Sequence, residues 1–92
     1  MSTEEVIYIS SKPILSYVTA IITALQRANN VKVLARGRAI SSAVDVVEVT
    51  KRSFLKDISV KDISIGTERL GEGETARNVS TISIHLSHTR EE

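Results

Sequence analysis

The segment from residue 14 to residue 25 constrains the fold of this chain more than any other part of the sequence. Its apolar residues recur at spacings of one, three, three, one and three, which trace one face of a helix. Runs rich in β-branched residues, typical of strands, stand on both sides of it, at residues 6–9 and 31–36. A strand–helix–strand unit of this kind sets its two strands parallel through a right-handed crossover.

The rest of the chain predicts a second helix and two more strands. A run that begins near Ser41 has its apolar residues on one helical face, with Asp45 and Glu48 in its early turns, although its valines leave a strand as the competing prediction. Residues 58–60 and 63–65 both alternate, but in opposite phase, which predicts a β-bulge or a change of the buried face at the two residues between them. Residues 82–86 alternate again and predict the last strand.

A polar segment at residues 66–78 separates these strands and contains three glycines. It is too long for a tight turn, so we expect a protruding β-hairpin arm with a mobile tip. The element order βαβαββ predicts a single domain over residues 1–92. Its expected architecture is an α/β two-layer sandwich, in which two helices cover one face of a mixed four-stranded sheet.

Several function classes are disfavoured by the residue inventory. The chain has no cysteine, so disulfides, thiolate metal sites and cysteine nucleophiles are excluded. His85 and His88 are three apart on a predicted strand and point to opposite faces, and no third metal ligand accompanies them. We therefore expect no enzymatic activity, no metal and no cofactor. No apolar run has the length of a membrane span or the form of a signal peptide, so we expect a soluble intracellular protein without a membrane partner.

The formal net charge is only +1, but the charges are unevenly distributed. Four of the eleven acidic residues lie at the two ends of the chain, and we interpret them as short solvated tails or as groups that compete with phosphate; they are Glu4, Glu5, Glu91 and Glu92. Between these ends, twelve basic residues stand against seven acidic ones. Binding depends on the local potential, so the low net charge does not argue against a polyanionic partner.

The strongest candidate binding residues surround a glycine. The string Arg36-Gly37-Arg38 lies between the second strand and the second helix, where glycine allows a sharp turn and a close approach to a ligand. Lys12 lies in the loop after the first strand, and the carboxyl ends of parallel strands share one sheet edge, so we expect it beside these arginines and near helix N-termini. Arg69 and Arg77 stand on the two legs of the predicted arm, where they would reach into a groove of DNA. The alternative is that they are scattered surface arginines.

Aromatic residues number only three, namely Tyr8, Tyr17 and Phe54, which disfavours single-strand recognition by base stacking. A second basic cluster, made of Lys51, Arg52 and Lys56, is explained by the helix dipole, because cations stabilise a helix C-terminus. Two apolar residues, Phe54 and Leu55, lie within that cluster. They mark either a contact surface or a place where one of the two is buried in the core.

Four segments, at residues 11–18, 35–41, 43–48 and 79–82, together resemble the Alba family of small archaeal chromatin proteins. The string Ala-Arg-Gly-Arg-Ala-Ile-Ser at residues 35–41 is the most specific of them. The resemblance implies a fold like the C-terminal domain of translation initiation factor three. It also implies a homodimer whose two arms straddle DNA, a role in coating and compacting the chromosome, and relatives that bind RNA.

The resemblance also assigns roles to individual residues. Phe54 matches a position where dimers meet side by side on DNA. The residues that it places at the nucleic-acid interface are Ser11, Lys12, Arg36, Gly37, Arg38, Ser42, Arg69 and Arg77. Two of them depart from the family pattern. Ser11 replaces a lysine that is acetylated in relatives, and Ser42 replaces a common lysine, so we expect looser DNA binding than in lysine-rich relatives.

Three functions are consistent with this sequence. The leading hypothesis is a non-enzymatic, largely sequence-independent double-stranded DNA-binding dimer, located on the chromosome in the cytoplasm. The second is an RNA-binding protein that acts on structured RNA or in translation through the same basic face. The third is a protein-interaction scaffold, whose function would not depend on Arg36 and Arg38.

Overall fold

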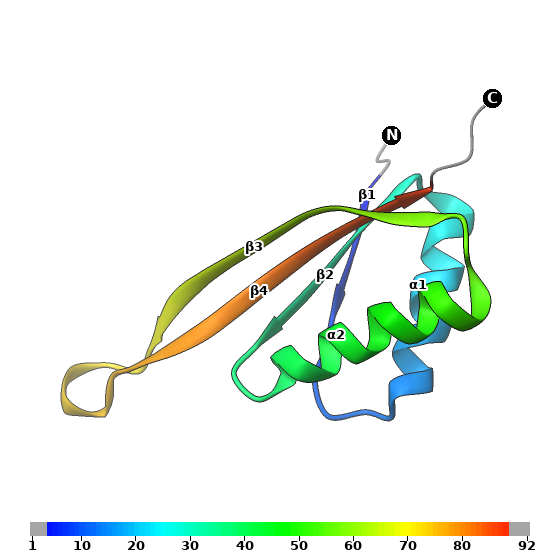
Figure 1. Ribbon diagram of the computed structural model, residues 1–92. Helices are drawn as coiled ribbons and strands as arrows, with labels where there is room; N and C mark the ends of the chain where they lie inside the picture. Colours follow the sequence, from blue (N-terminus) through cyan, green and yellow to red (C-terminus); the bar gives the residue numbers. More distant parts are fainter. Residues whose placement is uncertain (1–3, 89–92) are drawn as a thin grey trace.

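The structure is a computed structural model, and it describes residues 4–88. Within that range, four strands and two helices follow one another along the chain (Figure 1). Their bounds are β1 Glu4–Tyr8, α1 Ile14–Arg27, β2 Asn30–Arg36, α2 Ala39–Val49, β3 Ile58–Leu70 and β4 Arg77–His88. A π-helical turn, Thr50–Phe54, follows α2 directly, and a 3-10 turn, Gly73–Thr75, connects β3 to β4.

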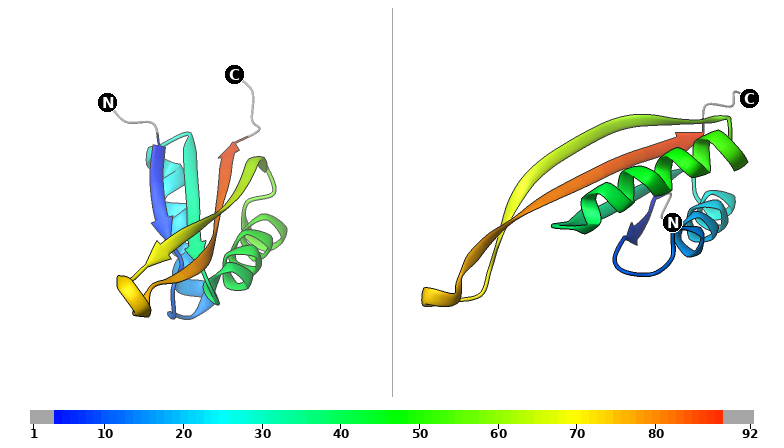
Figure 2. Two further views of the ribbon diagram at one scale, coloured as in Figure 1. Left: turned by 90° about the vertical axis from the view of Figure 1, so that its left-hand side faces the viewer. Right: turned by 60° about the horizontal axis from the view of Figure 1, so that its bottom comes forward.

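The strands form one mixed sheet in the order β1-β2-β4-β3. Strands β1 and β2 are parallel, with α1 as the crossover between them, as the periodicity of residues 14–25 predicts. Strand β4 pairs antiparallel with β2 on one side and with β3 on the other. Both helices pack on the same face of this sheet, which confirms the predicted two-layer sandwich (Figures 1 and 2).

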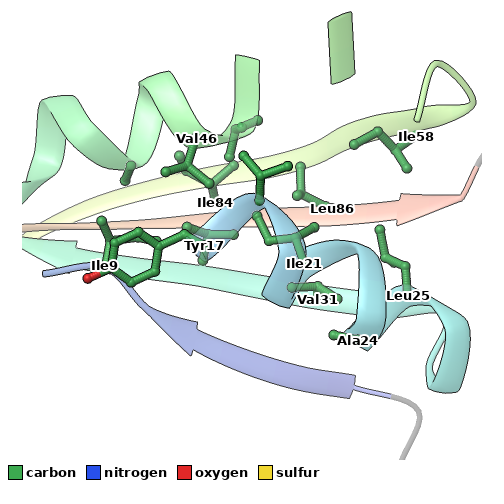
Figure 3. Packing of buried hydrophobic residues seen from close by; sticks show 14 of the residues in the cluster. Ile9, Tyr17, Ile21, Ala24, Leu25, Val31, Val46, Ile58, Ile84 and Leu86 are labelled. Carbon is green, nitrogen blue, oxygen red and sulfur yellow. The ribbon is translucent and has the colours of Figure 1, made fainter. Parts of the chain in front are cut away.

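The hydrophobic core lies between the helices and the sheet (Figure 3). Helix α1 contributes Val18 and Ile21, α2 contributes Val46, and the sheet contributes Val33 and Leu86, all of them at most 1 % exposed. Each fully buried aliphatic side chain of this kind contributes about 1.5–3 kcal/mol relative to an exposed one. Within residues 4–88, no helix lies over the opposite face of the sheet (Figure 1).

Helix α2 begins at Ala39, whereas the sequence predicts Ser41 or a neighbour as its cap. Gly37 has a positive φ of 60°, and the chain reverses there, so that Arg38 already has helical backbone angles and precedes the first residue of the helix. Asp45 consequently lies in the second turn and Glu48 in the last, so neither is in the first turn, where a carboxylate stabilises the helix dipole. Glu48 instead lies 3.8 Å from Arg52, one turn further along.

Strands β3 and β4 form a long hairpin that projects beyond the helices (Figure 2). A register shift lies between Val60 and Asp62, at the position that the phase change indicates. The ladder continues through the predicted hairpin arm as far as the pair Leu70–Arg77, and residues 71–76 form its tip. The hairpin extends the molecule to 53 Å along its longest axis, against 28 and 19 Å along the others.

The two glutamates near the start of the chain are not a solvated tail. Glu4 and Glu5 form the first residues of β1, and each makes an ion pair, with Lys32 at 3.9 Å and with Arg27 at 2.8 Å. The Arg27 guanidinium donates hydrogen bonds to Glu5 and holds the pKa of that carboxyl below its ordinary value. Glu91 and Glu92 lie outside the described residues.

Candidate nucleic-acid interface

The ends of β1 and β2 lie at one edge of the sheet because the two strands are parallel and in register, with Tyr8 opposite Leu34. The loop after β1 and the turn after β2 therefore emerge at the same end of the molecule (Figure 1). Lys12 lies in the first of these segments, and the string Arg36-Gly37-Arg38 forms the second. The two segments thus share one edge of the sheet, as the strand order predicts, but Lys12 is not among the residues that line the groove beside the arginines.

The turn at residues 36–38 is fixed to the hairpin by its central glycine. The Gly37 N–H donates a hydrogen bond of 2.9 Å to the Ser80 carbonyl, which continues the ladder between β2 and β4. A side chain at this position would be strained, because the φ of Gly37 is positive. Arg36 ends β2, and Arg38 directly precedes α2, and both side chains are exposed.

A groove of about 780 Å³ joins this turn to the β4 leg of the arm, and its lining includes Arg36, Arg38, Arg77 and Leu70. Three guanidinium groups from separate elements therefore border one surface depression. Arg36 and Arg77 are 41 positions apart in the sequence, and only the pairing of β4 with β2 and β3 brings them together. Guanidinium groups present planar sets of donors that match phosphate oxygens.

Arg69 does not share this groove with Arg77. In the β3–β4 ladder Arg77 pairs with Leu70, whereas Arg69 pairs with Asn78. Side chains alternate between the two faces along a strand, so Arg69 and Arg77 project from opposite faces of the arm. The two legs of the arm carry one arginine each, as the sequence indicates, but the two charges point in opposite directions.

The backbone of the loop that carries Lys12 is held by a residue that sequence analysis missed. The hydroxyl of Tyr17 on α1 accepts hydrogen bonds from the N–H groups of Ser10 and Lys12, at 2.8 and 3.0 Å. The Tyr17 side chain is itself buried, so this contact anchors the exposed loop to the core. Ser11 lies between the two bonded residues and is exposed. The only signal in the sequence was a hydroxyl on the apolar face of a helix, where it needs a partner.

A second missed residue is Glu68 on β3. Its carboxylate lies 3.0 Å from Nη1 of Arg36, and both side chains are about half exposed. The ion pair joins the arm to the turn at residues 36–38. Because a carboxylate occupies part of the guanidinium surface that would contact phosphate, Glu68 is positioned as an internal competitor for Arg36.

The two remaining candidates lie elsewhere. Ser42 is half-buried on α2 and does not line the groove. Phe54 is 52 % exposed at the end of the π-helical turn, whereas Leu55 packs against the core. Of the two apolar residues in that basic cluster, Leu55 is therefore the one directed to the core, and Phe54 remains accessible for contact.

The histidines make local structural contacts. His85 is 2.9 Å from the side-chain oxygen of Asn30, and His88 donates a hydrogen bond of 3.1 Å to the Leu25 carbonyl. Among residues 4–88, no three side chains of His, Cys, Asp or Glu are grouped so that they would hold a metal ion. Over the same residues, no helix is both long and apolar enough to cross a bilayer.

Comparison with known proteins assigns the chain to a family. The family model described as Alba matches residues 5–67. The DNA/RNA-binding protein Alba of Methanothrix thermoacetophila is 46% identical over 87 residues, which cover 94% of this chain and 98% of that protein. The DNA/RNA-binding protein Alba 1 of Archaeoglobus fulgidus is 44% identical over 85 residues, or 91% and 96% of the two chains. The solved structure of Alba from Thermoplasma volcanium has a TM-score of 0.85 at 39% identity, and covers 90% of this chain and 99% of that one. The chain is therefore a member of the Alba family.

Proposed function

We propose that this protein binds nucleic acid without catalysing a reaction, and that its main ligand is double-stranded DNA of any sequence. The observation that carries the proposal is the groove bordered by Arg36, Arg38 and Arg77 at the sheet edge where α2 begins. The names of its relatives, DNA/RNA-binding protein Alba, support the same class of ligand.

The mechanism follows from the donors at this edge. The guanidinium groups and Lys12 neutralise phosphates, and the positive end of the α2 dipole favours the same anions. Phosphate contacts fix the position of the protein but carry no sequence information, so binding is largely independent of sequence. Serine at positions 11 and 42 leaves fewer cations than lysine-rich relatives have, which makes the arginines more important here.

We also propose that the protein acts as a homodimer. Ile63 and Ile65 are 55 % and 81 % exposed on β3, the edge strand of the sheet. Their partners across the ladder are Ile84 and Ile82, whose side chains lie on the helix-bearing face of the sheet. Ile63 and Ile65 therefore also project from that face, at its uncovered edge. A second copy that covers this edge would bury the pair and place two arms on one assembly.

A dimer with two arms would coat DNA and compact the chromosome, and the protein would then be found on the nucleoid in the cytoplasm. Phe54 is accessible for a contact between neighbouring dimers. Structured RNA is the second candidate ligand, because the relatives' names include RNA and because arginine forks bind phosphates in either duplex.

Fluorescence anisotropy with labelled duplex DNA at several salt concentrations tests the proposal. The double variant R36A/R38A removes two phosphate contacts, so we expect weaker binding and a salt slope reduced by about 1.8. The matched control is K51A/R52A, which removes the same charge from the π-helical turn and should leave the slope unchanged. Equal effects of the two variants would contradict the proposal. Competition with duplex RNA at equal salt decides which nucleic acid is preferred.

A further inference from the structure

We infer that the open face of the sheet holds a second binding site, which takes one unpaired nucleotide of RNA or DNA with its base stacked on Tyr8. This inference rests on the proposed nucleic-acid binding and extends it from duplex phosphates to a flipped-out or single-stranded base. It concerns the face without helices, at the same edge as the turn at residues 36–38.

Tyr8 is the feature that requires an explanation. Its side chain is 72 % exposed at the end of β1, although tyrosine in a strand usually packs against its neighbours. The other tyrosine, Tyr17, is buried and its hydroxyl accepts a hydrogen bond from the Lys12 N–H, so its role is structural. Tyr8 has no such structural role in the core, because its ring is exposed. Three aromatic residues are too few for a platform that stacks several successive bases, but one exposed ring on a sheet surface offers the face on which a single unpaired base stacks.

The surface beside Tyr8 is a groove of about 760 Å³. Leu34 is the register partner of Tyr8 and lies next to it on the open face, with Ser83 and Ser64 following across the sheet. These residues give an apolar wall and two hydroxyl groups. The Ser64 hydroxyl donates to the Asp62 carboxylate at 3.2 Å and keeps its acceptor lone pairs for a base, whereas the Ser83 hydroxyl can donate and accept at the edge of any base.

The floor of the groove continues along the strands to Gly66 and Thr81, which face each other in the ladder. A Cβ at Gly66 would lie 3.3 Å from the Thr81 hydroxyl oxygen. Because glycine has no side chain, the groove stays open at this position. Arg36 stands at the same end of the groove. Only one of its nitrogens, Nη1, approaches Glu68, and the other donors remain for a phosphate.

The groove therefore combines an aromatic ring, hydroxyl groups and a guanidinium, which are the partners that a base and its phosphate need. A paired base cannot use this site, because both of its faces are covered within the duplex stack. The inference consequently predicts a preference for duplexes that carry an unpaired segment over blunt duplexes of the same sequence.

The test uses the full chain and compares a labelled RNA hairpin that has a short unpaired uridine tail with the same hairpin without it, and the equivalent pair in DNA. The variants are Tyr8→Leu, which keeps an apolar strand residue but removes the ring, and Tyr8→Phe, which keeps the ring. We expect Tyr8→Leu to lose roughly five- to hundredfold in affinity for the tailed ligand, whereas Tyr8→Phe binds it like the unchanged protein. Comparing how much the tail raises the affinity in RNA and in DNA shows which of the two nucleic acids the site prefers.

Affinity for blunt duplex DNA should be the same for all three proteins, which separates this site from the phosphate-binding groove. Tyrosine emission gives a direct readout, since the chain has two tyrosines and no tryptophan. We expect tailed ligand to quench the emission of the unchanged protein and blunt duplex to leave it unaltered. The inference is overturned if the tail adds no affinity, or if Tyr8→Leu binds the tailed ligand as tightly as the unchanged protein. Failure of the proposed function would differ, because the unchanged protein would then not bind the blunt duplex.

Discussion

Arg36 illustrates how one residue is shared between folding and binding. It ends β2, borders the groove with Arg77, and forms an ion pair of 3.0 Å with Glu68. An exposed pair of this kind is worth only about 0.2–1 kcal/mol, because water screens both partners. The contact is therefore weak enough for a phosphate to displace, and strong enough to reduce the affinity for that phosphate.

Replacing Glu68 by glutamine tests this competition. We expect E68Q to bind duplex DNA about two- to fivefold more tightly at low salt, because Arg36 no longer has to leave a carboxylate. The matched control is E48Q, which releases Arg52 from a similar exposed pair on α2. Anisotropy titration measures both. An E68Q affinity no higher than that of E48Q would contradict the role assigned to Glu68.

At the scale of elements, the arm is a two-stranded ribbon with distinct faces. The pairing of Leu70 with Arg77 sets Arg77 on the face of the groove, and Arg69 points away from that face. We expect R77A to lower the salt slope of DNA binding by about 0.9, the value for one phosphate contact, and R69A to change it less. Each variant removes one charge from the arm, so they control for each other. A larger loss for R69A would show that the opposite face of the arm meets the DNA.

Much of the element order is predictable from local patterns. The period of residues 14–25 and the alternation in the strands determine which residues are buried, and the phase change near residue 61 indicates the bulge. The early start of α2 escaped prediction because it depends on the positive φ of Gly37 rather than on a capping side chain.

The details of the site depend on contacts between distant segments, which no local pattern reveals. Glu68 is 32 residues from Arg36, and only the completed ladder places the two side by side. The opposite directions of Arg69 and Arg77 likewise follow from the register of β3 on β4. Tyr17 lies on the buried face of α1, and its hydroxyl is matched to the Lys12 loop only once β1 is in place.

At the scale of the whole molecule, the exposed isoleucines of β3 are the clearest sign of an assembly. A dimer with twofold symmetry would bury Ile65 twice, and a lysine there would introduce two buried charges. We expect I65K to raise the dimer dissociation constant by roughly a hundredfold or more, with the fold retained because the side chain is 81 % exposed in the single chain.

Sedimentation equilibrium measures this change, with circular dichroism to verify folding. Leu15 is 60 % exposed on α1, and L15K therefore serves as a control that places the same charge on another apolar surface site. A monomeric unchanged protein, or an I65K variant that dimerises normally, would contradict the proposed dimer edge.

Nucleic acid is expected to meet the protein at the carboxyl edge of the parallel strands and along the β4 leg of the arm. Backbone amide shifts of the isotope-labelled protein, followed by NMR during titration with blunt duplex DNA, test this expectation most directly. We expect the largest shifts at residues 10–12, 36–40 and 77–80. Shifts concentrated at residues 51–56 instead, with those three segments unchanged, would contradict it.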